Sequence, residues 1–398
     1  MANNNENKVL NVPHLRFPEF KGEWETKLIN DLAVVIGGGT PDTTIKSYWD
    51  GEIQWFTPSE IGKNKYVDSS LRTITEEGLN NSSAKLLPPN TILLSSRATI
   101  GECSLSLREC ATNQGFQSLV SKKCYVDFLY YLIQTKKRDL IRKSCGSTFL
   151  EISANEVRKI QVSVPTDVEQ QKIAGLLSLI DERIATQNKI IEDLKKLKSA
   201  IIDYAINSLD TDFGKFGSLY EIAGEGGTPT TSNASFYDNG KIPFIKIDDL
   251  KQKYLIENND FITELGLQKS SAWLVPTRSI LFSNGATIGE ITITTYPVCT
   301  KQGILGIVPK QSIDVEFLYY FMSSSYFKKA VSCIVTEGTM KTAYLKDINN
   351  ILCPIPTKEK QQEIVKMPSA LNSKIDIEQS ILKLFITQKQ HLLRQMFI

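Results

Sequence analysis

Residues 74–102 read ITEEGLNNSSAKLLPPNTILLSSRATIGE, and residues 262–290 read ITELGLQKSSAWLVPTRSILFSNGATIGE. The two stretches align without a gap at an offset of 188 residues (262 − 74), and most positions are identical. Shorter matches flank them in the same order: GGTP with GGTP, TNQG with TKQG, and FLYY with FLYY. A collinear series across half of the chain indicates duplication of a whole unit. Its period is far above the roughly 20 to 50 residues typical of solenoid repeats.

The duplication continues into segments of a different kind. VPTDVEQQKI (Val164–Ile173) aligns with IPTKEKQQEI (Ile355–Ile364) at an offset of 191 residues (355 − 164). Beyond these segments, apolar residues recur at steps of three and four, which predicts two long helices with narrow coiled-coil seams. The predicted seam residues are Ile173, Leu177, Ile180, Ile184, Ile191, Leu194 and Ile201, then Ile364, Leu371, Ile375, Leu382, Phe385, Leu392 and Met396.

Polar residues interrupt both seams at matching places, Gln187 and Lys198 in the first helix and Glu378 and Lys389 in the second. Because a helix with an apolar seam needs a partner, we expect the two helices to pair, with these polar positions helping to set the register. Pro368 lies inside the second predicted helix, and proline removes a helix hydrogen bond. We therefore expect a kink at Pro368, or a helix that starts near it.

The segments before the helices predict two α/β heads. The short apolar runs NTILLSS and RSILFSN are bounded by Pro, Gly and Ser, as strands are, whereas DFLYYLIQTKKRDLIRK has helical spacing. GGTP and ATIGE are typical of tight turns. The expected organisation is an N-terminal arm, a first head, a central helix, a second head and a C-terminal helix, at residues 1–23, 24–165, 166–210, 211–356 and 357–398.

Composition narrows the classes of function. The chain has 398 residues, a formal net charge of +2 and no run of about 20 apolar residues, so we expect no membrane span. The polar start is unlike a signal peptide, and seven cysteines without a C-x-x-C pair suit reduced thiols in the cytoplasm. Only two histidines occur, His14 and His391, which argues against a histidine-based catalytic or metal site. Phosphate-binding and dinucleotide-binding glycine motifs do not occur either.

Several segments together resemble the specificity subunit of Type I restriction–modification systems. They are HLRFPEFKGEWE (His14–Glu25), GGTP, ATIGE with a downstream NQG, and VP…EQQKI leading into IDERIATQNKIIEDL. Each motif alone is weak, but their order is specific, and the resemblance covers nearly the whole chain. It implies that each head is a target recognition domain reading one half of a split DNA sequence. It also implies that the helices form an antiparallel coiled coil that fixes the distance between the half-sites.

The resemblance implies partners as well: double-stranded DNA, two methyltransferase subunits docked on the helices, and restriction subunits in the full complex. The heads share a framework but differ at many positions, so we expect an asymmetric bipartite target. The partners would carry the catalysis, and we predict no catalytic residue, cofactor or metal in this chain. A protein–protein scaffold is the alternative, which the near-neutral charge favours slightly; salt-dependent DNA binding would separate the two.

Residues that differ between the heads are better candidates for base reading than ATIGE, which we interpret as framework. Arg97 precedes ATIGE where the second copy has Gly285, and it suits guanine or phosphate, although an ordinary surface arginine is the alternative. KKRDLIRK carries five positive charges on about two helical turns. We interpret this helix face as one that follows the DNA phosphates, and a solvated helix face is the alternative. Lys328 and Lys329 occupy the matching helix of the second half. Solvated loops are the alternative for the lysines that follow probable strands, which are Lys63, Lys65, Lys246, Lys251 and Lys253. The candidate DNA-binding residues are Lys63, Lys65, Arg97, Lys136, Lys137, Arg138, Arg142, Lys143, Lys246, Lys251, Lys253, Lys328, Lys329 and Lys341.

Overall fold

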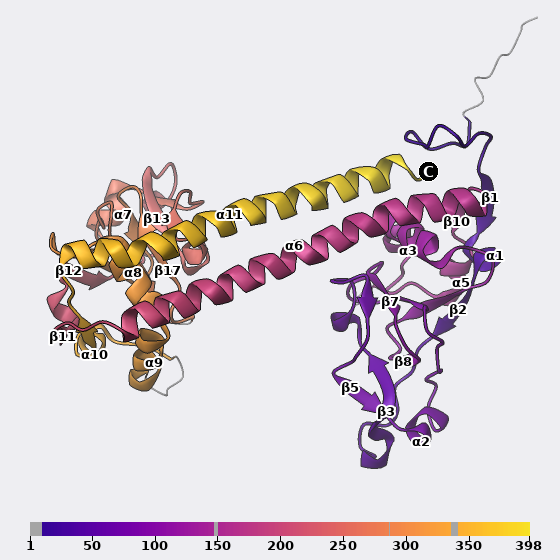
Figure 1. The fold of residues 1–398 in the computed structure, drawn as a ribbon, viewed down its shortest axis with the longest axis horizontal. Coiled ribbons are helices and arrows are strands. Elements are labelled where there is room, and N and C mark those ends of the chain that lie inside the picture. Colours follow the sequence, from indigo (N-terminus) through magenta and orange to yellow (C-terminus); the bar gives the residue numbers. More distant parts are fainter. Residues whose placement is uncertain (1–9, 147–149, 286, 336–340) are drawn as a thin grey trace, which may run out of the picture. The chain divides into compact units, whose positions relative to one another are not determined.

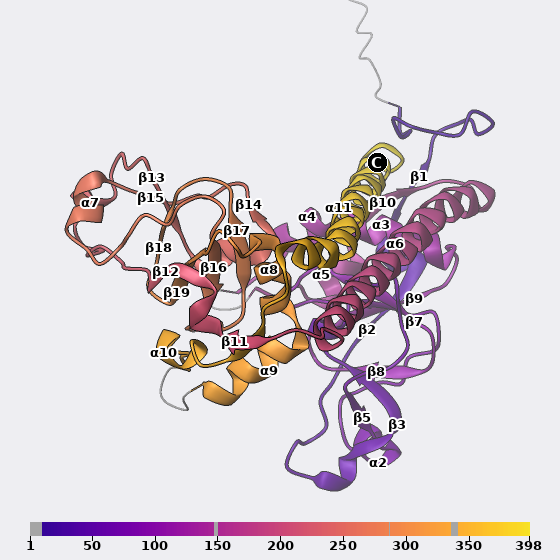
Figure 2. The same cartoon turned by 60° about the vertical axis from the view of Figure 1, so that its left-hand side comes forward.

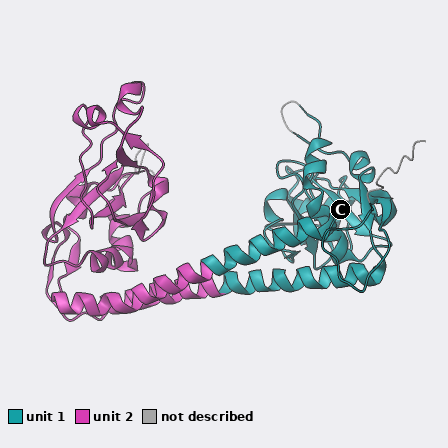
Figure 3. Ribbon diagram, turned by 90° about the horizontal axis from the view of Figure 1, so that it is seen from above, with its two compact units in different colours: residues 1–189, 380–398 teal, residues 190–379 magenta. Residues whose placement is uncertain are grey.

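The computed structural model describes residues 10–146, 150–285, 287–335 and 341–398. The first nine residues of the predicted arm, and Ala286 of the second ATIGE, therefore lie outside the described residues. The chain divides into two compact units, residues 1–189 with 380–398 and residues 190–379 (Figure 3). None of the helices in the described ranges combines the length and apolar character needed to cross a membrane.

The first unit contains an α/β head built on three small sheets (Figure 1). Its five-stranded sheet has the order β2 (Ala33–Gly37), β9 (Gln117–Ser121), β6 (Ile92–Leu94), β7 (Cys103–Ser106), β4 (Tyr66–Val67). The two other sheets are β5 (Arg72–Ile74), β3 (Trp49–Phe56), β8 (Cys110–Thr112), and β1 (Glu25–Leu28) with β10 (Gln161–Val164). Its helices are α1 (Ile29–Leu32), α2 (Glu76–Asn80), α3 (Val126–Thr135), α4 (Lys137–Arg142) and α5 (Ala154–Arg158).

The second unit repeats this head strand for strand (Figure 2). Its five-stranded sheet is β12 (Tyr220–Glu225), β19 (Ile304–Pro309), β16 (Ile280–Ser283), β17 (Ile291–Thr294), β14 (Tyr254–Leu255). The smaller sheets are β15 (Phe261–Ile262), β13 (Ile242–Ile245), β18 (Cys299–Thr300), and β11 (Phe213–Lys215) with β20 (Leu352–Pro354). Its helices are α7 (Glu264–Gln268), α8 (Val315–Ser323), α9 (Ser325–Ile334) and α10 (Leu345–Ile348). The duplicated α/β architecture expected from the sequence is confirmed.

The repeated ITExG segment has a local structural reason in both heads. The Thr75 hydroxyl accepts a hydrogen bond from the Gly78 N–H at 3.0 Å and caps α2. The Thr263 hydroxyl accepts one from the Gly266 N–H at 3.1 Å and caps α7. Threonine is a favoured N-cap because its side chain satisfies a free amide of the first helical turn.

Each head is layered, with a helix between its five-stranded sheet and a long helix. In the first unit, Leu105 of the sheet, Phe128 of α3 and Leu177 of α6 (Asp167–Asn207) belong to one buried cluster. In the second unit, α8 packs on β17 in the same way. DFLYYLIQTKKRDLIRK forms two helices, α3 and α4, which meet at Lys136.

The long helices α6 and α11 (Lys358–Gln395) pack against each other with opposite chain directions in both units. In the first unit, Leu177 shares a core with Phe397, which follows α11, while Asp181 further along α6 contacts Lys389, earlier on α11. In the second unit, Lys198 contacts Asn372. Further along α6, Ile202 and Ile206 pack in one cluster with Ile364 and Val365 near the start of α11.

Pro368 is buried within α11, which runs through it without interruption. The expectation that a helix starts near Pro368 is wrong. A proline inside a helix removes one intrahelical hydrogen bond, and the remaining bonds and packing of a helix of 38 residues bridge that position.

The QQ pair at the start of both long helices is also explained by local structure. The side chain of Gln170 accepts the Tyr125 N–H at 3.0 Å and donates to the Pro165 carbonyl at 3.0 Å. Gln361 accepts the Asp314 N–H at 2.7 Å and donates to the Pro356 carbonyl at 2.9 Å. Each buried glutamine thereby fixes the start of a long helix to the chain that precedes α3 or α8.

Candidate nucleic-acid interface

The repeated loop motifs lie at one edge of the five-stranded sheet. In the first head, β2 ends at Gly37 opposite Gln117, where β9 begins, and β6 ends at Leu94 opposite Cys103, where β7 begins. GGTP, TNQG and ATIGE adjoin these strand ends, so they come together although they are far apart in sequence. The antiparallel pairs β12–β19 and β16–β17 bring the corresponding motifs together in the second head.

GGTP is closely packed framework in both heads. A Cβ atom added to Gly38 would lie 1.9 Å from the carbonyl oxygen of Asn113, and one added to Gly226 would lie 2.2 Å from that of Thr300. Only glycine allows this approach of two backbone segments. The motif therefore holds the loop cluster together.

ATIGE is a tight turn, as expected. The Gly101 N–H donates to the Ser95 carbonyl at 3.1 Å, and the Ser95 N–H donates to the Glu102 carbonyl at 2.9 Å. Gly101 has a φ of 87°, in the left-handed region that favours glycine. Ile100 is buried in the first core, and Ile288 is partly buried against the second. The framework interpretation accounts for these contacts.

Side chains that differ between the heads surround these shared turns. In the first head, Arg97 forms a 2.8 Å ion pair with Glu151, and the two residues also pair through their backbones. In the second head, Gly285 occupies the position of Arg97 and pairs with Thr342. The same framework thus presents an arginine and a glutamate in one head and a glycine and a threonine in the other.

Lys301 was not among the sequence-based candidates, although it replaces Asn113 in an otherwise shared motif, TKQG against TNQG. The Asn113 side chain accepts the Gly115 N–H at 2.8 Å, whereas Lys301 is exposed. Lys341 is also exposed, two residues before Ala343, whose N–H donates to the Asn284 carbonyl at 2.9 Å. The charge difference within an aligned motif was the signal that could have identified Lys301.

The other predicted DNA contacts fall into paired and unpaired groups. The paired cations are in Lys137–Glu102, Arg142–Asp139, Lys143–Glu156, Lys246–Asp260 and Lys251–Asp248. Within the described ranges, no ion pair engages the exposed residues Lys63, Arg138, Lys328, Lys329 and Lys341. Exposed ion pairs contribute only about 0–1 kcal/mol, so the paired cations can still exchange a carboxylate for a phosphate.

Three of the predicted lysines make internal contacts. Lys136 donates to the carbonyl oxygen of Ile398 at 2.7 Å, and its burial lowers the pKa of its ammonium group. The side chains of Lys65 and Lys253 are 7% and 4% exposed and form ion pairs with Asp127 and Glu316. A phosphate contact by either of the last two ammonium groups would require breaking its ion pair.

The predicted seam residues of α6 and α11 are all buried or half-buried. The polar interruptions differ in their contacts. Gln187 and Glu378 are each 7% exposed, Lys389 forms an ion pair with Asp181, and Lys198 donates to the Asn372 amide oxygen. The polar positions are therefore part of the packed helix surface.

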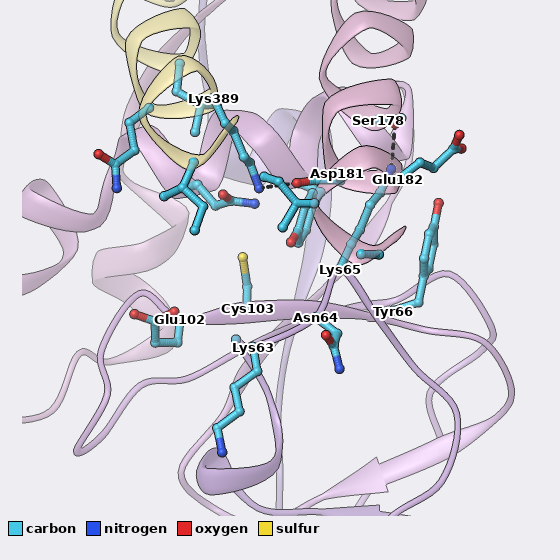
Figure 4. Close-up of a pocket in the computed structure, with 18 of the residues that line it drawn as sticks. Lys63, Asn64, Lys65, Tyr66, Glu102, Cys103, Ser178, Asp181, Glu182 and Lys389 are labelled. Atoms are coloured by element: carbon cyan, nitrogen blue, oxygen red, sulfur yellow. Dashed lines mark hydrogen bonds and ion pairs between the residues drawn. The ribbon is translucent and has the colours of Figure 1, made fainter. Parts of the chain in front are cut away.

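A cavity of about 670 Å³ lies within the first unit, between the loop before β4, the ATIGE turn and the two long helices (Figure 4). Its wall carries both signs of charge, including Lys63 and Lys389 with Glu102 and Asp181. Cys103 also lines it, but burial raises the pKa of this thiol to about 12, so it is not poised as a nucleophile. Among the described residues, no group of three or more His, Cys, Asp or Glu is arranged to hold a metal ion.

The comparisons with known proteins agree with this architecture. The family model for the Type I restriction modification DNA specificity domain matches residues 21–196 and again residues 209–384. The chain is 30% identical, over 374 residues and 86% of both chains, to the Type I restriction enzyme MjaIX specificity subunit of Methanocaldococcus jannaschii.

Two solved structures share the fold. The S subunit of a Type I restriction–modification system from M. genitalium has a TM-score of 0.55 at 18% identity, covering 97% of this chain and 99% of that one. A chain from a study of complex assembly and conformational transition in the Type I system has a TM-score of 0.60 at 15% identity, with coverages of 96% and 98%. The two family matches and the 30% identical relative together establish the family. The chain belongs to the Type I restriction–modification DNA specificity subunits, and it is a non-catalytic subunit with two target recognition domains.

Proposed function

We propose that each head reads one half of an asymmetric, bipartite DNA target through the loop cluster at the edge of its five-stranded sheet. The observation that carries this proposal is the replacement of side chains on an otherwise shared framework. Arg97 becomes Gly285 and Asn113 becomes Lys301, while GGTP keeps the same close packing. The N–H groups of Gly101 and Gly289 also donate equivalent hydrogen bonds, to the carbonyl groups of Ser95 and Ser283. Base reading requires donors and acceptors that differ between targets, held in a fixed geometry.

In this proposal, α6 and α11 set the spacing between the half-sites and dock two methyltransferase subunits, which restriction subunits join in the full complex. Large apolar side chains on these helices support a docking role. Leu179 and Leu384 are 59% and 68% exposed in the first unit, and Tyr204 and Met367 are 76% and 61% exposed in the second. Because these helices already pair through a seam, their exposed apolar side chains remain available to a second interface.

A methylome tests the proposal. The chain is co-expressed with its cognate methyltransferase subunit, and modified adenines are mapped by single-molecule sequencing. We expect one split motif with two defined halves and a fixed spacer, and replacement of one head by that of another specificity chain should change only one half.

An unsplit motif would contradict the proposal. So would the absence of new methylation when the same methyltransferase is active with another specificity chain, and that result would favour a protein–protein scaffold.

A further inference from the structure

A lysine occupies the same buried position in both halves of the chain and joins three elements. In the first junction, Lys65 lies 2.5 Å from Asp127. It also donates to the Ser178 hydroxyl at 2.7 Å (Figure 4). Lys65 precedes β4, Asp127 lies at the start of α3, and Ser178 lies on α6. The sheet edge, the head helix and the long helix thus converge on one ammonium group.

The second unit repeats the junction with the corresponding residues. Lys253 lies 2.8 Å from Glu316 of α8 and donates to the Ser369 hydroxyl of α11 at 3.0 Å. It also donates to the Tyr320 hydroxyl at 3.0 Å, and Tyr320 in turn contacts Ser369 at 3.0 Å. In the first junction, Tyr131 occupies the position of Tyr320, and its hydroxyl lies 3.4 Å from Ser178.

A buried lysine is an expensive way to hold two elements together. Removing an ammonium group and a carboxylate from water costs about as much as their attraction returns, so such pairs add little net stability compared with apolar packing. Burial opposes the charge of Lys253, but the hydrogen bonds with Glu316 and Tyr320 outweigh it and raise the pKa of the lysine. The charge is therefore retained, and it demands one geometry, because each donor direction has its own acceptor.

The position of these junctions matters for the proposed function, on which this inference rests. Each one ties a head to the helix that would separate the half-sites. We propose that Lys65 and Lys253 are positioning residues that fix the angle of each head on the long helices and so determine which spacer length the complex accepts. Apolar packing alone leaves neighbouring angles close in energy, whereas the junction penalises them by an unpaired buried charge.

The test uses the assembled methyltransferase complex and a set of duplexes carrying the cognate half-sites. Their spacers are the native length, one base pair shorter and one base pair longer. We expect Lys253→Met to reduce the preference for the native spacer by roughly tenfold or more, the size of a typical coupling between two sites. Ser369→Ala removes the long-helix hydroxyl, which accepts from Lys253 and donates to Glu316 at 2.9 Å, and it keeps the ion pair between Lys253 and Glu316. It should reduce the preference in the same direction. Lys65→Met and Ser178→Ala should do the same through the first junction.

Two controls separate positioning from folding. Val331→Ala removes core volume from the second unit without changing a junction residue. Lys269→Met removes an exposed lysine from the same unit. Val331→Ala should lower methylation at all three spacers in proportion, and Lys269→Met should change none of them.

The outcomes also separate the positioning role of the two lysines from the proposed function on which it rests. The junction variants could methylate more slowly and still prefer the native spacer as strongly as the wild type does. That result would overturn the positioning role and leave bipartite reading intact. A wild type that methylates none of the duplexes would instead overturn the proposed function.

Discussion

The ammonium group of Lys389 lies 2.7 Å from the carboxylate of Asp181, on the helix packed against it. At the equivalent place in the other unit, Lys198 faces the amide of Asn372 at 3.0 Å. The helix pair therefore carries the same lysine twice, once beside a carboxylate and once beside its neutral analogue. The two lysine contacts should therefore affect the stability of the protein, and the dependence of that stability on pH, in different ways.

Asp181→Asn would give the first unit the lysine–asparagine contact of the second. We expect it to lower the free energy of unfolding by about 1–2 kcal/mol, because an ion pair between opposite charges becomes a hydrogen bond from the ammonium group to a neutral amide. The Tyr131 hydroxyl donates at 2.6 Å to the carboxylate oxygen of Asp181 that Lys389 does not contact. In the variant, this hydroxyl would face the amide NH2 and accept a hydrogen bond from it. Urea denaturation measures the change. Glu182→Gln, at the next and exposed position of α6, is the control, and equal stability of the two variants would contradict the expectation.

Lys198 should make stability depend on alkaline pH. Burial lowers its pKa in the folded protein from the ordinary value of 10.5. The unfolded chain then binds this proton more tightly than the folded one, so the folded state gains stability as the pH rises through the lowered pKa towards 10.5. Relative to Lys198→Met, the wild type should therefore gain stability as the pH rises through the lowered pKa of Lys198 towards 10.5. Denaturation of both proteins across this range checks the sign, and a constant difference would rule out the linkage.

Arg16 balances a buried charge at the start of α6. Its guanidinium contacts both carboxylate oxygens of Glu169, at 2.7 and 2.8 Å, and Glu169 is only 1% exposed. Without Arg16, the side-chain donor that remains near Glu169 is the Trp24 indole N–H, 3.3 Å from its carboxylate. We expect Arg16→Ala to cost about 3–5 kcal/mol, the usual penalty for leaving one member of a buried ion pair. The double variant Arg16→Ala, Glu169→Gln should recover part of this in a denaturation cycle, and strict additivity would contradict the coupling.

Lys301 should contribute to DNA affinity through charge. If its ammonium group neutralises one phosphate, Lys301→Ala lowers the slope of log affinity against log salt by about 0.9. Binding of the complete methyltransferase complex to its target at several salt concentrations gives the slope. Lys269→Ala, at another exposed position of the same unit, should leave the slope unchanged. An unchanged slope for Lys301→Ala as well would place Lys301 away from the phosphates.

The duplicated heads and the pairing of the long helices could be predicted from the sequence, because a repeat and a helical spacing of apolar residues are both visible as sequence patterns. The contacts of Lys65 and Lys253 could not. Their partners lie 62 and 63 residues away at Asp127 and Glu316, so a lysine in a loop could not be distinguished from a buried one by pattern. Charge alone likewise could not show that three of the five cations of the KKRDLIRK cluster form ion pairs with carboxylates. Pro368 shows the opposite error, since local propensity was overridden by the helix and packing around it.

The cluster that joins Trp24, Phe128 and Phe397 has a consequence for synthesis on the ribosome. The first unit needs residues 380–398, whereas the second is the continuous segment 190–379. At translation rates of about 5–20 residues per second, the first head waits roughly 10–40 s for its last core residues after residue 189 has been made. During that interval, the nascent chain exposes the aromatic surface of the first head, while the second can begin to assemble as an inserted domain. The core of the first head can therefore be completed only after the second unit has been made, and early chaperone contact should concentrate on the half that is made first.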